Sequence, residues 1–180
     1  GYVRLAEPIT PALLEATRQL ATQAGALPRF AETLSRAADR ARDQRELGLA
    51  CDLYLRLGAM YEAELNDPAL AAAKYAEAEA TGDRQVEAWR ALDRVCAASG
   101  DKAGQIRALR AWVNTGVESD GLAEQLDALY RLAAIELADE ATREDGCEAL
   151  TWALDREPQY ERAAAMLREA AQAAPTHEKL

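Results

Sequence analysis

The sequence predicts an all-α protein in which antiparallel helix pairs stack side by side as an α-solenoid. Three observations favour this fold: the composition, the residues that begin and end helices, and an internal repeat. Of the 180 residues, 42 are Ala and 24 are Leu, whereas Val and Ile together number only 8. Ala and Leu favour helices and β-branched residues favour strands, so helices are expected throughout. With 49% hydrophobic residues, the chain can bury a core.

Four helices are expected in the first part of the chain. Thr10 and Asp67 each precede a proline, as an N-cap residue precedes the first helical position. Gly25 and Gly82 each follow an apolar segment, as glycine does at helix C-termini. Within one helix, apolar residues recur every three or four positions, as at Leu53, Leu57, Met60 and Tyr61. The expected helices are 11–24, 28–42, 45–65 and 68–81.

Five more helices follow by the same reasoning. Gly100 and Gly116 are the expected helix-ending glycines, and Leu126, Leu129 and Leu132 have helical spacing. The connections are short, so consecutive helices should pack antiparallel. The expected helices are 84–99, 102–115, 119–139, 143–156 and 159–173, which makes about nine in all.

An internal repeat supports the helix pairs. A shift of 75 residues superimposes residues 10–85 on residues 85–160 without a gap. Turns and apolar positions coincide, with Gly25 on Gly100 and Leu57 on Leu132. Each 75-residue unit covers four helices, that is, two helix pairs.

Within each unit the finer pattern resembles the tetratricopeptide repeat (TPR). The resemblance is most specific at Tyr54-x-x-Leu57-Gly58-x-x-Tyr61 followed by Ala71-x-x-x-Tyr75-x-x-Ala78. Looser matches carry Trp89-x-x-Leu92 and Leu129-x-x-Leu132-Ala133. The resemblance implies a right-handed solenoid whose first helices of each pair line a concave face. Trp112 and Asp93 depart from the family, which has small residues at these two positions.

The expected organisation has four parts. Residues 1–9 are an N-terminal extension or cleavage scar, and residues 10–158 hold the two units of two TPR-like helix pairs. A capping helix at 159–175 and a tail at 176–180 follow. The chain opens with Gly1 and not Met, so we expect a fragment of a larger protein.

Composition excludes several classes of function. The only histidine is His177, which leaves no His-based catalytic triad, general base or zinc cluster, and we expect neither an enzyme nor a cofactor or metal. The net charge of −10 disfavours binding to nucleic acid, and no apolar stretch is long enough to span a membrane. Three cysteines without a CxxC pair are expected to be reduced thiols on helices, which favours the cytoplasm.

The resemblance implies a binding groove on the concave face, and its arginines would form a ladder that suits carboxylates. We expect a protein scaffold that binds a peptide or partner protein in this groove, and the arginines favour an acidic one. The predicted partner-binding residues are Asp52, Arg56, Glu62, Glu87, Arg90, Arg94, Asp127, Tyr130 and Arg131.

Other interpretations stay open. Asp52–Arg56 and Asp127–Arg131 have i, i+4 spacing and Glu87–Arg90 has i, i+3 spacing, so these arginines could simply be paired along their own helices. The chain could be a structural spacer or oligomerisation solenoid with an unoccupied groove. RNA recognition by a helical-pair array is disfavoured by charge. An acidic surface could support self-association with the mildly basic first 45 residues of another copy; its members are Glu136, Asp139, Glu140, Glu144, Asp145 and Glu148.

Overall fold

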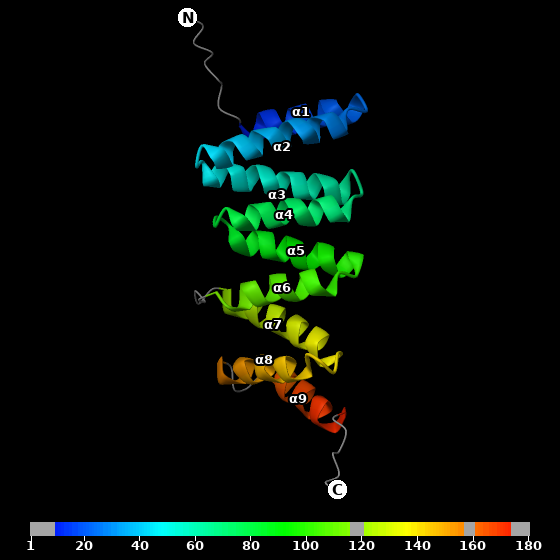
Figure 1. Ribbon diagram of the computed structural model, residues 1–180, viewed down its shortest axis with the longest axis vertical. Coiled ribbons are helices and arrows are strands. Elements are labelled where there is room, and N and C mark those ends of the chain that lie inside the picture. Colours follow the sequence, from blue (N-terminus) through cyan, green and yellow to red (C-terminus); the bar gives the residue numbers. More distant parts are fainter. Residues whose placement is uncertain (1–9, 116–120, 157–160, 174–180) are drawn as a thin grey trace, which may run out of the picture. The chain divides into compact units, whose positions relative to one another are not determined.

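The computed structural model of the chain describes residues 10–115, 121–156 and 161–173. These residues form nine helices and no strand, which confirms the predicted all-α class (Figure 1). The expected extension at 1–9, the tail at 176–180 and the helix-ending Gly116 lie outside the described residues. The chain divides into two compact units between Arg84 and Gln85.

The first unit contains four helices, and the second contains five within the described ranges. The first comprises α1 (Pro11–Gln23), α2 (Leu27–Asp43), α3 (Leu47–Ala63) and α4 (Pro68–Ala80). The second comprises α5 (Gln85–Ser99), α6 (Lys102–Val113), α7 (Leu122–Leu137), α8 (Arg143–Arg156) and α9 (Glu161–Ala173). In each unit, helices that are consecutive in the chain pack on one another and reverse direction at each turn, as in α-solenoids (Figure 1).

The residues predicted to begin and end helices do so by direct contacts. The side chains of Thr10 and Asp67 accept hydrogen bonds from the backbone N–H groups of Leu13 (3.2 Å) and Leu70 (3.0 Å). Asp101 caps α6 in the same way, through Gly104 (3.0 Å). Such caps satisfy backbone donors that have no partner inside the helix.

Left-handed backbone conformations end three helices. Gly25, Gly82 and Gly100 have φ values of 64°, 79° and 76°, which glycine adopts without steric cost. Three non-glycine residues among those described, Arg45, Asn66 and Arg84, also have positive φ, at 62°, 52° and 44°. The turns at Arg45 and Asn66 carry no glycine, so their conformation was not evident from the sequence.

The α3–α4 hairpin shows why helix pairs of this composition pack closely. Gly58 on α3 faces the ring of Tyr75 on α4, and a Cβ atom at position 58 would overlap that ring. Tyr75 is buried, and its hydroxyl donates to Glu62 Oε2 (2.8 Å). A small residue on one helix thus makes room for a large one on the other.

The equivalent α7–α8 hairpin packs closely through a small residue at a different position. The positions 75 residues further on hold Ala133 and Leu150, both fully buried; Ala133 is larger than Gly58, and Leu150 is smaller than Tyr75. Here the closest approach lies at Gly146 of α8, where a Cβ would stand 3.1 Å from Leu137 N and 3.2 Å from Ala133 O. Close helix packing therefore depends on one small residue per hairpin.

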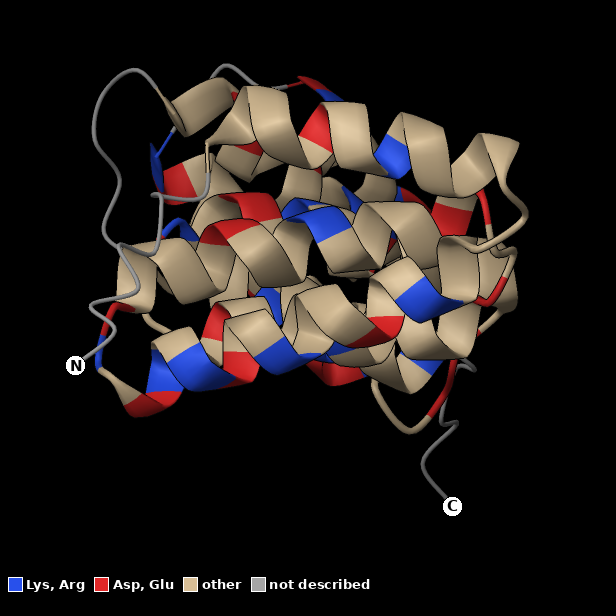
Figure 2. Ribbon diagram, turned by 90° about the horizontal axis from the view of Figure 1, so that it is seen from above, with Lys and Arg blue, Asp and Glu red and all other residues tan. Residues whose placement is uncertain are grey.

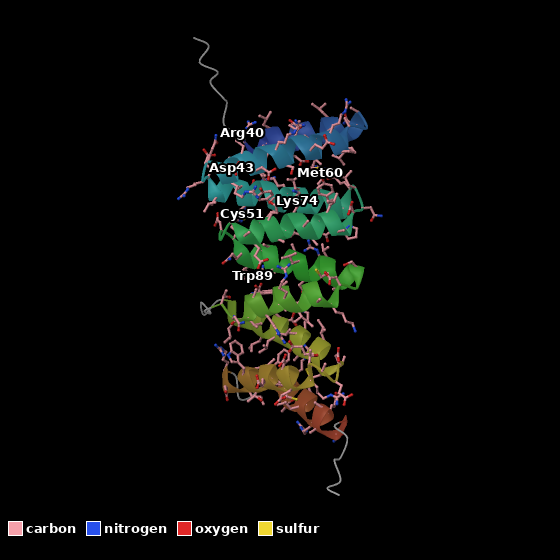
Figure 3. The ribbon with its side chains drawn as sticks, in the orientation of Figure 1. Arg40, Asp43, Cys51, Met60, Lys74 and Trp89 are labelled. Atoms are coloured by element: carbon pink, nitrogen blue, oxygen red, sulfur yellow. The ribbon has the colours of Figure 1, made fainter. Side chains whose placement is uncertain are left out.

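The three helices α2, α3 and α4 also meet around one aromatic ring. Tyr54 of α3 is fully buried and its hydroxyl donates to Asp39 Oδ1 of α2 (2.7 Å). Lys74 of α4, labelled in Figure 3, lies 5.7 Å from the centre of the Tyr54 ring and donates to Ser35 Oγ of α2 (3.2 Å). These contacts fix α2 against the α3–α4 hairpin.

Candidate functional site

The second unit holds a groove lined by α5, α6 and α7, with a volume of about 780 Å³. Four of the predicted partner-binding residues line it together: Arg90, Arg94, Asp127 and Arg131. The remaining lining comes from Asp93, Ala97, Gln105, Trp112, Ala123 and Glu124. The groove therefore combines charged side chains of both signs with one large aromatic ring.

Trp112 is the aromatic residue of the groove lining. Its ring is 6% exposed, and two guanidinium groups lie over it, with Cζ of Arg90 at 5.4 Å and Cζ of Arg131 at 5.8 Å from the ring centre. Contacts at these distances are favourable cation–π interactions. Trp112 is one of the two residues that depart from the TPR pattern, in which this position is small, and here its bulk lies at the groove.

Arg131 is held from beneath by a buried carboxylate. Asp93 is almost completely buried and forms an ion pair with Arg131 and accepts a hydrogen bond from Gln105 Nε2 (2.8 Å). Burial lowers the pKa of Arg131, but an arginine remains charged at any physiological pH. Asp93 and Gln105 therefore keep this guanidinium in place.

Some of the predicted arginines pair along their own helices, and others pair across helices. Asp52–Arg56 (2.7 Å) and Asp127–Arg131 (3.1 Å) are ion pairs along their own helices, as the i, i+4 spacing predicted. Arg90, in contrast, reaches from α5 to Glu124 of α7 and forms an ion pair with it. Glu124 was not predicted; the available signal was its position 34 residues after Arg90, close to the length of one helix pair, or half of the 75-residue unit.

Five predicted residues lie elsewhere or have another role. Asp52, Arg56 and Glu62 belong to α3 of the first unit, and Asp52 also pairs with Arg84 (3.2 Å). Glu62 accepts the hydrogen bond from Tyr75 described above. Tyr130, which was expected on the groove surface, is fully buried, so its ring belongs to the core, with Cζ of Arg162 at 5.0 Å from the ring centre. Glu87 lies exposed in the first turn of α5 and is absent from the groove lining.

Arg56 lines a second hollow, of about 340 Å³, between α1, α2 and α3. This hollow is largely apolar, with Leu14, Phe30, Leu34 and Met60 in its wall; Met60 is labelled in Figure 3. At its edge Arg18 bridges Glu15 (2.6 Å) and Glu64 (2.7 Å). It thus offers little unpaired charge to a ligand.

The acidic cluster predicted near the α7–α8 turn is only partly exposed to solvent. Glu136 is 1% exposed and accepts a hydrogen bond from Arg110 Nε (2.8 Å), while Arg110 also donates to Asp145 Oδ2 (2.5 Å). The prediction that Glu136 is a solvated member of this cluster is therefore wrong, because the Arg110 side chain neutralises it inside the unit. Burial raises the pKa of Glu136, and the hydrogen bond from Arg110 opposes that rise.

Charges of both signs recur along the same helices, as Figure 2 shows. Among the described residues, no group of three or more His, Cys, Asp or Glu side chains is placed to hold a metal ion. None of the described helices combines the length and apolar character that crossing a bilayer requires. Comparison of the chain with protein-family models, with curated proteins and with solved structures found no match.

Proposed function

We propose that the chain is a right-handed, TPR-like solenoid that acts as a protein-interaction scaffold and carries no catalytic activity. A segment of a partner protein binds in the groove of the second unit. The observation that supports this proposal is that Arg90, Arg94, Asp127 and Arg131 line one groove together with Trp112. A cytoplasmic location is consistent with three free cysteines.

The chemistry of the groove suits a peptide segment better than a small metabolite. The lining is open and charged, and it lacks the enclosed apolar wall typical of small-molecule pockets. Arginine and tryptophan are enriched at the centres of protein interfaces, because both combine a large contact area with directed hydrogen bonds. A groove between helices fits an extended or helical segment.

The arginine pairs leave the groove available to a partner. The side chains of Arg90 and Glu124 are 45% and 56% exposed, so water already competes with their attraction. An exposed ion pair of this kind contributes about 0.2–1 kcal/mol. A partner carboxylate that reaches Arg90 would replace this contact at little cost.

The test is a capture experiment with the tagged 180-residue chain and quantitative mass spectrometry. The double variant Arg90→Glu/Arg94→Glu reverses two groove charges one helical turn apart. The matched control, Arg36→Glu/Arg40→Glu, reverses two exposed charges with the same spacing on α2. Groove binding predicts proteins that the wild type and the control retain and that the groove variant loses by about tenfold or more. Circular dichroism checks that all three chains keep their helices.

If the groove variant captures the same proteins in the same amounts as the wild type, the proposal fails. That result would favour the alternative function as a structural spacer. Light scattering of the same three chains then shows whether the chain self-associates.

A further inference from the structure

The Arg90–Glu124 pair crosses the groove of the second unit from α5 to α7. Arg90 and Glu124 therefore line different sides of the groove, and the ring of Trp112 from α6 lies below Arg90. Because both charged side chains are about half exposed, this bridge can open without exposing a previously buried charge. When Arg90 moves away, the Trp112 ring loses the cover that this guanidinium provides.

The second guanidinium over Trp112 behaves differently. Arg131 is bound to the buried carboxylate of Asp93 and to Asp127 Oδ2 (3.1 Å). Removing Arg131 from Asp93 would leave an uncompensated charge in the interior, which is strongly unfavourable. Trp112 is therefore covered by one fixed guanidinium and by one that can be displaced.

The charges of the groove lining balance. Three arginines face three acidic residues, so the lining has no net charge. A ligand of a single sign could pair with either Arg90 or Glu124 but would leave the other without its partner. A ligand that carries both signs replaces one bridge by two contacts and leaves neither group unpaired. Charge complementarity thus favours a ligand with both signs.

We propose that the groove recognises a partner segment with an acidic side chain for Arg90 and a basic side chain for Glu124. The residue between them contacts the uncovered face of Trp112. This inference rests on the proposed function and adds the chemical class of the partner. The Arg90–Glu124 bridge is the contact that the segment replaces.

The experiment uses three synthetic peptides of about 12 residues, a length that spans one such groove. All share a central Leu in a Ser background; one adds Glu, one adds Lys, and one adds both. Binding to the 180-residue chain is measured by fluorescence anisotropy. The wild-type chain is expected to bind the mixed peptide at least about tenfold more tightly than either single-sign peptide.

Charge reversal on either wall should redirect this preference. Arg90→Glu leaves two acidic groups at the bridge and should prefer the Lys peptide. Glu124→Arg leaves two basic groups and should prefer the Glu peptide. The control Arg36→Glu lies on α2 and should keep the wild-type preference. Both bridge residues are exposed, so neither change is expected to unfold the chain.

A second measurement locates the bound peptide. The chain labelled with 5-fluorotryptophan gives a ¹⁹F resonance for Trp112, assigned through Trp112→Phe. Binding of the mixed peptide should shift this resonance, and Arg90→Ala should shift it without peptide because the ring loses its cover. An unshifted Trp112 resonance in both cases would overturn the inference.

The outcomes separate this inference from the proposed function. If the Glu peptide binds the wild type as tightly as the mixed peptide and shifts Trp112, the groove binds peptides but the two-sign inference is wrong. If none of the peptides binds, the two-sign inference is also wrong, and the capture experiment alone decides the proposed function.

Discussion

The ring of Tyr75 lies directly over the Cα of Gly58, in the space that a side chain at position 58 would need. This contact sets the distance between α3 and α4. It also joins a residue of the TPR-like motif on one helix to a residue of the same motif on the next. The closeness of the hairpin therefore depends on the absence of one methyl group.

Gly58→Ala is expected to destabilise the chain by about 1–3 kcal/mol, because overpacking forces the buried Tyr75 ring to move. Urea unfolding followed by circular dichroism measures the loss. Gly121→Ala is the control, since a Cβ there meets no atom within 4 Å. The double variant Gly58→Ala/Tyr75→Leu should lose less than the sum of the two single variants. Equal stability of Gly58→Ala and wild type would contradict the packing described here.

The ion pair between the half-exposed Arg110 and the buried Glu136 should be far more sensitive to loss of the arginine than to loss of the charge on the glutamate. Arg110→Ala leaves a buried carboxylate without its counter-charge and should cost on the order of 3 kcal/mol. Glu136→Gln keeps an acceptor for Arg110 Nε and should cost much less. The free energies of unfolding in urea test this order, and the reverse order would contradict it.

The pH dependence of Glu136→Gln follows from the same burial. The pKa of Glu136 is raised above its ordinary value of 4.5 by burial. The folded state therefore holds this proton more tightly than the unfolded state, and the stability it contributes is complete below pH 4.5 and is lost as pH rises through the raised pKa. Relative to wild type, Glu136→Gln should gain stability between pH 4.5 and pH 7. A relative loss over this range, measured by urea unfolding, would show that the sign is wrong.

Tyr54→Phe should cost about 1 kcal/mol, because the hydroxyl loses its hydrogen bond to Asp39 while the ring keeps its contacts with Arg42 and Lys74. Tyr61→Phe is the matched control at a half-exposed position on the same helix. Thermal unfolding by circular dichroism compares the two. Equal melting temperatures of Tyr54→Phe and Tyr61→Phe would show that the α2–α3 hydrogen bond does not contribute to stability.

Of the three cysteines, Cys147 should react first with a thiol reagent. It is half-buried, whereas Cys51 and Cys96 are buried, and burial with the nearby Asp101 carboxylate raises the pKa of Cys96. Because the thiolate is the reactive form, the raised pKa slows Cys96, and burial limits the access of the reagent to both Cys51 and Cys96. Titration with Ellman's reagent should show one fast thiol per chain, and Cys147→Ser should remove that fast phase. A fast phase that survives this substitution would place the accessible thiol elsewhere.

The sequence by itself determined the helices. The helix-capping residues act through contacts within a few positions, as at Thr10, Asp67 and the glycines at 25, 82 and 100. Their effect on the backbone can therefore be predicted without knowledge of the tertiary structure. The i, i+4 ion pairs of Asp52 with Arg56 and of Asp127 with Arg131 were predictable for the same reason. The groove arginines were predicted only through the resemblance to a family.

Only the tertiary structure decided what those arginines contact. Arg90 pairs with Glu124, and Arg131 pairs with Asp93. In each pair the two residues lie on different helices and more than 30 positions apart in the chain. Tyr130 and Glu136 occupy positions that a helical pattern allows on a surface, yet both are buried, because the neighbouring helices cover them. Local spacing predicts which side of a helix a residue occupies. Its burial and its charge pairing depend on which helix packs against that side.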